Sequence, residues 1–251
     1  MLLGHVLQVN RAWLYAHADA RLNAVQRDRF DALLQSRKSG VPIAYLLGHR
    51  EFYGRDFTVT PAVLIPRSET ELVVETALEK LDDPSACVVD VGTGSGCIAL
   101  TLAAERPDWQ VSAVDISDDA LAVCRANADR LALKRVEILQ GDLLAPVADR
   151  RFDAVVSNPP YVAAKDPHLT RGDLRFEPGL ALSADRQGLE VIERLLDQAV
   201  TCLHPGGWLI IEHGHQQAAT VRQLFSQAGL TQISTRRDLA DIERVTLGNL
   251  P

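Results

Sequence analysis

The stretch "CVVDVGTGSGCIAL", residues 87–100, decides the fold, because a buried strand, a glycine loop and a helix follow one another directly. Gly92, Gly94 and Gly96 let the backbone turn tightly and come close to a ligand, since a Cβ would clash or forbid the dihedral angles. The loop alone is only moderately specific, because a strand-to-helix turn without a ligand uses the same glycines. It nevertheless predicts one strand of a parallel sheet.

Extended and helical patterns alternate from Ser68 onward. The extended segments are 87–91, 110–115, 135–140, 152–157, 207–213, 231–235 and 243–248. The helical segments are 69–81, 97–105, 117–131, 188–203 and 215–229. This alternation predicts an α/β fold in which helices cover both faces of a seven-stranded, mostly parallel sheet. Ligands of such sheets bind at the carboxyl ends of the strands.

The first fifty residues show little β-branched alternation and instead predict a small helical domain. Within 23–40, Val25, Phe30, Leu33 and Leu34 fall near one helical face, and Gly40 follows as a stop. We therefore expect residues 1–50 to form a small helical domain. A hairpin connector over 51–66 and a larger α/β domain over 67–251 complete the expected division.

The hairpin connector is predicted from its aromatic residues and prolines. Phe52, Tyr53 and Phe57 suggest two short strands, and Pro61 and Pro66 interrupt any helix that would follow.

Composition narrows the class of protein. The net charge is −7 and the isoelectric point is near 5.5, which disfavours broad binding to nucleic-acid phosphates. The four cysteines form no Cys-x-x-Cys pair, so we expect neither a zinc site nor disulfides but buried thiols in a reducing compartment. No apolar run is long enough to cross a bilayer, and the first residues lack the pattern of a secretory signal. A cytoplasmic location without membrane contact is expected.

Three acidic residues follow the first three strands. Asp90, Asp115 and Asp142 are therefore expected at one edge of the sheet, where they would repel a pyrophosphate. They would attract a sulfonium or an ammonium and accept hydrogen bonds from ribose hydroxyls. S-adenosylmethionine is thus favoured over a nicotinamide dinucleotide, with Asp115 at the ribose and Asp142 and Leu143 at the adenine. Each acid alone could instead be a helix cap or a turn residue.

The fourth strand ends in "SNPPY", residues 157–161. Proline has no N–H, so this stiff stretch leaves main-chain carbonyls free to accept hydrogen bonds. Asn158 adds a side-chain carbonyl, and Tyr161 adds a flat wall. Several acceptors beside a flat wall suit a planar NH2 group, which is either an amide or the exocyclic amine of a base. The alternative without a ligand is that Asn-Pro only starts a turn.

Methyl transfer to such a nitrogen requires no strong general base. Two acceptors that hold both N–H groups orient the nitrogen and stabilise the positive charge that develops on it. The proton can leave after the N–C bond has formed. Catalysis at this site would therefore depend on orientation and electrostatics.

Motifs along nearly the whole chain resemble the HemK/PrmC family of release factor glutamine methyltransferases. They include "GVPIAYLLGHREFYGRDFTV", "LIPRSETELVV", "AVDISDDAL", "SNPPYV", "GDLRFEPGLAL" and "LHPGGWLIIEHGHQQ". The resemblance implies a class I, Rossmann-like methyltransferase fold. It also implies methyl transfer from S-adenosylmethionine, leaving S-adenosylhomocysteine, to the glutamine amide in the Gly-Gly-Gln motif of class I peptide chain release factors. The N-terminal domain would help to hold the release factor.

The strand ends and the resemblance together give the predicted site. The cofactor-binding residues are Asp90, Gly92, Thr93, Gly94, Ser95, Gly96, Asp115, Ile116, Asp142, Leu143 and Asn158. The residues that would hold the glutamine amide are Asn158, Pro159, Pro160 and Tyr161, of which Asn158, Pro159 and Tyr161 are predicted to be catalytic. No metal is predicted. The sequence departs from the family at Leu143, where an aromatic residue is common, and relatives usually carry further helical residues ahead of Met1.

Two other functions fit parts of the pattern. An N6-adenine or N2-guanine methyltransferase of nucleic acid would use almost the same chemistry at Asn158, although the negative charge disfavours it. A non-catalytic, cofactor-binding scaffold would be marked by damage to the Asn-Pro-Pro-Tyr motif, which is intact.

Two further sets of residues admit two interpretations each. His213 and His215 could suggest a metal, but a structural role at a strand end is favoured because no third ligand is near in the sequence. Arg171, Arg175 and Glu177 could cover the bound glutamine or pin their own segment by ion pairs.

Overall fold

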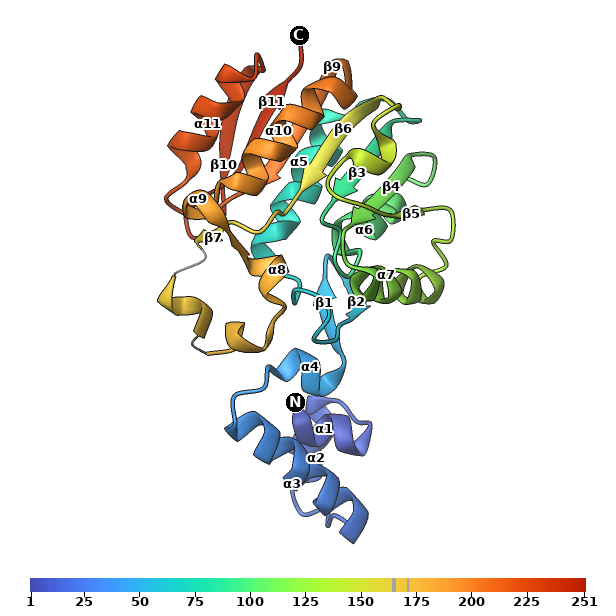
Figure 1. Ribbon diagram of the computed structural model, residues 1–251. Helices are drawn as coiled ribbons and strands as arrows, with labels where there is room; N and C mark the ends of the chain where they lie inside the picture. The colour runs from blue at the N-terminus through green and yellow to red at the C-terminus, as the bar shows by residue number, and fades with distance from the viewer. Residues whose placement is uncertain (164–165, 171) are drawn as a thin grey trace.

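The computed structural model describes residues 1–163, 166–170 and 172–251 (Figure 1). A seven-stranded sheet forms the larger part of the molecule, as the alternating pattern predicts. In spatial order its strands are β10 (Thr231–Arg237), β11 (Glu243–Asn249), β9 (Leu203–Glu212), β6 (Phe152–Ser157), β3 (Cys87–Val91), β4 (Gln110–Asp115) and β5 (Glu137–Gln140). β11 is antiparallel to both of its neighbours, and the other pairings are parallel. The prediction of a mostly parallel sheet is therefore confirmed.

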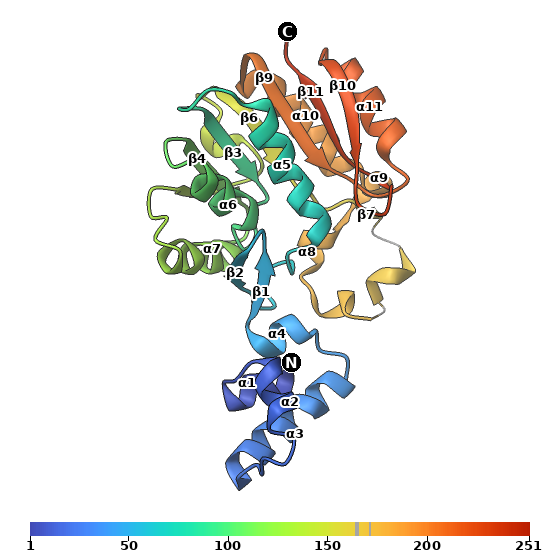
Figure 2. The same ribbon diagram turned by 180° about the vertical axis from the view of Figure 1, so that it is seen from behind.

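The two faces of the sheet carry separate hydrophobic cores, because side chains alternate along each strand. Val88 of β3 packs with α5 (Glu71–Lys80), α6 (Cys97–Glu105) and α7 (Asp118–Arg130). Val89, on the opposite side of the same strand, packs with α10 (Glu190–Cys202) and α11 (Ala218–Gln227). Figure 1 shows α10 in front of the sheet, and Figure 2 shows α5 covering the reverse face.

The N-terminal region is helical, as predicted, and it lies beyond the hairpin at one end of the molecule (Figure 1). Its helices are α1 (Leu2–Leu7), α2 (Arg11–Ala16), α3 (Ala24–Lys38) and α4 (Ile43–Leu47). α3 begins with a capping box, in which the Asn23 side chain accepts from the Gln26 N–H and the Gln26 side chain accepts from the Asn23 N–H. Val25 is 67% exposed, so the apolar face of α3 is not buried at this position.

A short hairpin joins the two parts (Figure 2). It consists of β1 (His49–Phe52) and β2 (Arg55–Thr58), so it begins ahead of the expected boundary at residue 51. The turn residues Tyr53 and Gly54 have φ angles of 51° and 72°, as in the two-residue turns that match strand twist. Phe52 and Phe57 are fully buried and pack edge to face.

The chain between β6 and α10 forms short elements that the sequence pattern did not indicate. They are β7 (Val162–Ala163), η3 (Pro167–Thr170), η4 (Leu174–Phe176), α8 (Gly179–Leu182), β8 (Ser183–Ala184) and α9 (Asp185–Gly188). We call the described part of residues 162–188 the crossover segment. Two further 3-10 turns are η1 (Ser68–Thr70) and η2 (Ala145–Val147).

Candidate active site

A pocket of about 440 Å³ opens at the carboxyl ends of the central strands. β3 lies between β4 and β6, so the chain reverses its direction of travel across the sheet at this point. Such a reversal leaves a crevice at which open α/β sheets bind ligands. The loops after β3, β4, β5 and β6 supply one side of the pocket, and the crossover segment and α10 supply the other. The volume lies within the range of small-molecule sites.

The three glycines of the loop after β3 have different surroundings. Gly92 and Gly94 line the pocket with φ angles of 72° and 55°, and a Cβ on either would meet almost no neighbouring atom. Gly96 does not line the pocket, and a Cβ there would lie 2.7 Å from the Cys124 sulfur. The open space beside Gly92 and Gly94 therefore suits a ligand that approaches the backbone closely, whereas Gly96 serves packing.

Asp90 lies beneath this loop and is completely buried. Its Oδ2 accepts hydrogen bonds from the Thr93 hydroxyl (2.6 Å) and from the Ala99 N–H (3.1 Å). Its Oδ1 has no partner among the described residues. Burial raises the pKa of Asp90 to about 7, and these two hydrogen bonds oppose the shift. Asp90 thus anchors the loop to α6 and does not line the pocket.

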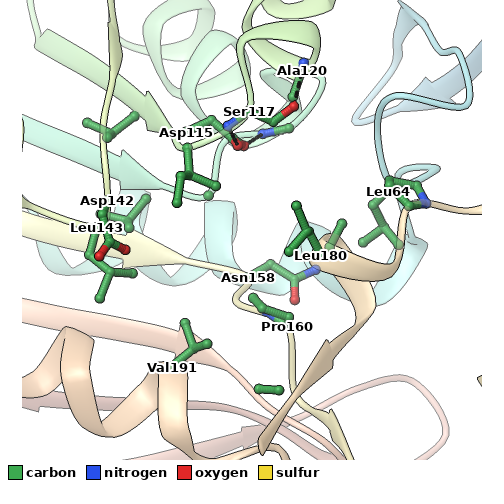
Figure 3. Close-up of a pocket in the computed structure, with 18 of the residues that line it drawn as sticks. Leu64, Asp115, Ser117, Ala120, Asp142, Leu143, Asn158, Pro160, Leu180 and Val191 are labelled. Atoms are coloured by element: carbon green, nitrogen blue, oxygen red, sulfur yellow. Dashed lines mark hydrogen bonds between the residues drawn. The ribbon is translucent and has the colours of Figure 1, made fainter. Parts of the chain in front are cut away.

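Asp115 lines the pocket and also holds two loops in place. Its Oδ2 accepts from the Gly94 N–H at 2.8 Å, and its Oδ1 accepts from the Ser117 N–H at 2.9 Å. The Ser117 hydroxyl accepts from the Ala120 N–H and so caps α7 (Figure 3). A carboxylate has further lone pairs, so Asp115 can still accept from a ligand.

Asp142 lines the same pocket, but Arg194 of α10 forms an ion pair with it. Because Asp142 is paired and burial disfavours ionised Asp90, the negative charge at this edge is smaller than the three acids alone suggest. Ile116 and Leu143 provide apolar surface on this side of the pocket. Leu143 has a φ of 52°, a left-handed conformation that is unusual for leucine.

Asn158 and Pro160 line the pocket between the side that carries Asp115 and Asp142 and the wall that carries Leu64 and Leu180 (Figure 3). The Asn158 Nδ2 donates to the Thr70 hydroxyl at 3.0 Å. No described residue donates a hydrogen bond to the side-chain oxygen of Asn158, Oδ1. This oxygen is also not one of the fully buried atoms that lack a partner.

The main chain of the same motif also offers acceptors. The backbone hydrogen bonds of the described loops include none to the carbonyl oxygen of Pro159 or Pro160. These two main-chain carbonyls and the side-chain carbonyl of Asn158 therefore remain available as acceptors, and of the three residues Asn158 and Pro160 line the pocket.

A buried carboxyl group lies behind Asn158. Glu212, at the end of β9, is 1% exposed and accepts from the Thr70 hydroxyl (2.7 Å) and from the Tyr161 hydroxyl (3.0 Å). Burial raises the pKa values of both Glu212 and Tyr161. Thr70, Glu212 and Tyr161 thus form one hydrogen-bonded group with Asn158.

Sequence reasoning missed Thr70 and Glu212. Glu212 carried the same signal as Asp90 and Asp115, namely an acid at the end of a buried strand. Thr70 carried no signal, since it lies in the polar run at the start of a helix.

The pocket brings together part of the predicted set. Its lining includes Gly92, Gly94, Asp115, Ile116, Asp142, Leu143, Asn158 and Pro160. The predicted residues outside the lining are Asp90, Thr93, Ser95, Gly96, Pro159 and Tyr161.

The crossover segment is fixed to the rest of the molecule at several points. Glu177, whose side chain is fully buried, accepts from the Ile65 N–H at 3.0 Å and from Arg67 at 2.5 Å. Arg175 donates to the carbonyl of Ser39, after α3. These contacts support the interpretation in which Arg175 and Glu177 pin their own segment, whereas Arg171 lies outside the described residues.

The first histidine of the pair at the end of β9 has a structural role. His213 is fully buried, and its ring nitrogens contact the Gly214 carbonyl (3.1 Å) and the Thr246 hydroxyl (2.9 Å). Across the ranges that the structure describes, no group of three His, Cys, Asp or Glu side chains is placed to hold a metal ion. The same ranges contain no helix that is both long and apolar enough to span a bilayer.

Comparisons with known proteins agree with this architecture. Residues 1–48 match the family model of the PrmC N-terminal domain, and residues 68–172 match that of the methyltransferase small domain. A release factor glutamine methyltransferase of Xylella fastidiosa is 48% identical over 251 residues, covering 100% of this chain and 91% of the relative. The Escherichia coli K12 protein of the same name is 46% identical over 248 residues, covering 99% and 90%. This chain belongs to the release factor glutamine methyltransferase family.

Solved structures share the fold of this methyltransferase at much lower sequence identity. A methyltransferase from Pyrococcus furiosus gives a TM-score of 0.60 at 16% identity, covering 87% of this chain and 96% of that one. The hMettl16 catalytic domain, solved in complex with a 3′UTR hairpin, gives a TM-score of 0.65 at 16% identity, covering 83% and 80%. At this identity the likeness concerns the fold alone.

Proposed function

We propose that this protein transfers a methyl group from S-adenosylmethionine to the glutamine side-chain nitrogen in the Gly-Gly-Gln motif of class I release factors. The observation that supports it most is the acceptor-rich edge at Asn158, Pro159 and Pro160 beside the glycine-lined pocket. Full-length relatives at 46% to 48% identity are named for this activity.

The pocket fits the cofactor on three counts. The space beside Gly92 and Gly94 admits a group close to the backbone. Asp115 can accept from ribose hydroxyls, and Ile116 and Leu143 offer apolar surface to the adenine. When bound, S-adenosylmethionine would supply a methyl group on a sulfonium, which is a good leaving group.

The chain's own residues would orient the acceptor nitrogen. The side-chain carbonyl of Asn158 and the main-chain carbonyl of Pro159 would each accept one N–H from the glutamine amide. They would thereby direct the nitrogen toward the methyl group. The same two oxygens would stabilise the positive charge that develops on the nitrogen as it takes the methyl group. The nitrogen then loses one proton to solvent, so no side chain has to act as a strong base.

The N-terminal helical domain, residues 1–50, would help to hold the release factor, and residues 67–251 would carry the chemistry. The crossover segment lies between them, because Arg37 and Ser39 contact it from α3 and the loop after it, and Pro178 and Leu180 line the pocket. Such an enzyme acts in the cytoplasm.

The deciding experiment supplies purified release factor, unmodified DNA and unmodified RNA with labelled S-adenosylmethionine. We expect label on the release factor, and mass spectrometry should locate one added methyl group on the glutamine of the Gly-Gly-Gln peptide. A release factor in which alanine replaces that glutamine is the control. Label that appears only on nucleic acid would contradict the protein substrate, and no label on any substrate would favour a scaffold.

A further inference from the structure

The hydrogen bonds behind Asn158 have a fixed direction. In the structure Glu212 accepts from both hydroxyls, with Thr70 donating to Oε2 at 2.7 Å and Tyr161 donating to Oε1 at 3.0 Å, and these two hydrogen bonds oppose the rise that burial causes in the pKa of Glu212. Thr70 has a single hydroxyl proton, and once it is donated the Thr70 oxygen can only accept. The group of Asn158 that faces Thr70 must therefore be its NH2.

This direction decides which end of the Asn158 amide is left for the substrate. An amide has its carbonyl and its NH2 on opposite arms, so holding the NH2 at Thr70 leaves the carbonyl unpaired at the pocket. A reversed amide would present donors to a substrate nitrogen that itself carries two donors. The reversed form could not hold the NH2 group of a glutamine amide.

We infer that Thr70 and Glu212 are positioning residues, which fix the Asn158 carbonyl toward the methyl-accepting nitrogen through a one-way relay of hydrogen bonds. Neither residue lines the pocket, and both are buried, at 2% and 1% exposure. Burial strengthens the relay, because an unpaired polar group there would be costly. The expected effect on kcat rests on the proposed function, whereas the hydrogen-bond geometry does not depend on it.

Thr70→Val tests the relay in the full-length protein, because valine keeps the branched shape and removes the hydroxyl. We expect kcat for release factor methylation to fall on the order of 10- to 100-fold, the size of effect that follows from poor orientation of a reacting group. The KM for S-adenosylmethionine should change much less. Thr70→Ser, which restores a hydroxyl, should recover most of the loss.

A double-mutant cycle separates positioning from a general structural effect. If Thr70 acts through Asn158, Thr70→Val should lower kcat little further in the Asn158→Ala background. The inference would be overturned by a Thr70→Val protein with kcat within about twofold of wild type, by no recovery in Thr70→Ser, or by fully multiplicative effects in the cycle.

A measurement that does not depend on enzyme activity tests the hydrogen-bond relay separately from the proposed substrate. In the ligand-free protein, NMR should find slow solvent exchange of the Asn158 side-chain NH2 protons, and Thr70→Val should make it fast. Equal exchange rates would overturn the relay even if the enzyme is active. A slow wild-type rate that rises in the variant would support the relay even if the release factor is not methylated. Thr70→Ala serves the same purpose if the valine variant does not fold.

Discussion

At the scale of single residues, Asn158 is the side chain on which the chemistry depends most. It lines the pocket, yet its NH2 group is used by Thr70, so its carbonyl is what it offers to a substrate. Asn158→Ala should lower kcat on the order of 100-fold, as the loss of one preorganised electrostatic partner does in other enzymes. Isothermal titration calorimetry with S-adenosylhomocysteine should find affinity changed by only a modest factor. Unchanged turnover would show that the carbonyl is not an essential acceptor.

Asp90 should make the folded protein less stable as pH rises. Its pKa is raised from 3.8 to about 7 because burial disfavours the ionised form, and its hydrogen bonds with Thr93 and Ala99 oppose this only in part. A raised pKa contributes stability that is fully present below about pH 4 and is lost as pH rises through about 7. The shift corresponds to about 4 kcal/mol over this interval.

Asp90→Asn tests this contribution, because the amide does not titrate and its carbonyl can still accept from Thr93 and Ala99. Urea unfolding at pH 5 and pH 8 should give a flatter dependence of the unfolding free energy on pH in the variant. Comparison with wild type removes the shared contribution of other buried acids such as Glu212. Parallel pH dependences in the two proteins would contradict the assignment to Asp90.

At the scale of elements, the three loop glycines divide into ligand-facing and packing positions. Gly96 caps the N-terminus of α6 with a φ of 82°, and a Cβ there would also lie 2.9 Å from a Leu100 methyl group. Gly54, in the hairpin turn, has a similar φ of 72° but open space around it. Gly54→Ala should therefore cost about 1–2 kcal/mol from backbone strain alone.

Gly96→Ala adds overpacking against Cys124 and Leu100 to the same backbone strain. The free energy of unfolding should therefore fall by roughly 1–3 kcal/mol more than in Gly54→Ala. Urea denaturation of both variants measures the difference. Equal losses would mean that Cys124 and Leu100 can move aside, and that the glycine is required for its dihedral angles only.

The sequence predicted the central elements well, because buried strands carry a strong signal. The predicted spans of β3, β4, β6 and α6 coincide with the observed ones. The start of β9 was missed, because Pro205 and Gly206 are typical of a turn, whereas Leu203 pairs with Phe152 beyond an irregularity in the ladder. The short elements of the crossover segment have no periodicity of their own and take their form from tertiary contacts.

The candidate site could be predicted where residues follow strands and could not where partners come from distant parts of the chain. Asp115 and Asn158 were found because strand ends meet at one edge of a parallel sheet. The pairing of Asp142 with Arg194 and of Asn158 with Thr70 depends on how α10 and η1 pack on the sheet. No local pattern encodes those contacts.

At the scale of the whole molecule, two acids hold the crossover segment between the helical domain and the pocket. One is buried and the other is exposed. Glu177 is fully buried between Ile65 and Arg67, whereas Asp173 pairs with Arg37 at the surface, with side-chain exposures of 48% and 38%. Leu180, a few residues beyond Glu177, lines the pocket. The position of the pocket wall should therefore depend on Glu177 far more than on Asp173.

Glu177→Gln should destabilise the fold by about 2 kcal/mol or more, because the Ile65 N–H and Arg67 contact different oxygens of Glu177 and glutamine keeps only one, and because Arg67 loses its anionic partner. Without these contacts, the part of the pocket wall that carries Leu180 must become ordered when the ligand binds. Affinity for S-adenosylhomocysteine should therefore fall roughly tenfold. Asp173→Asn, the matched control on the same segment, should change stability by less than about 1 kcal/mol. Calorimetric titration and urea unfolding of the two variants measure both quantities. Equal effects would mean that the segment is held by its surface contacts with the helical domain, and the buried glutamate would then have no special role in shaping the pocket.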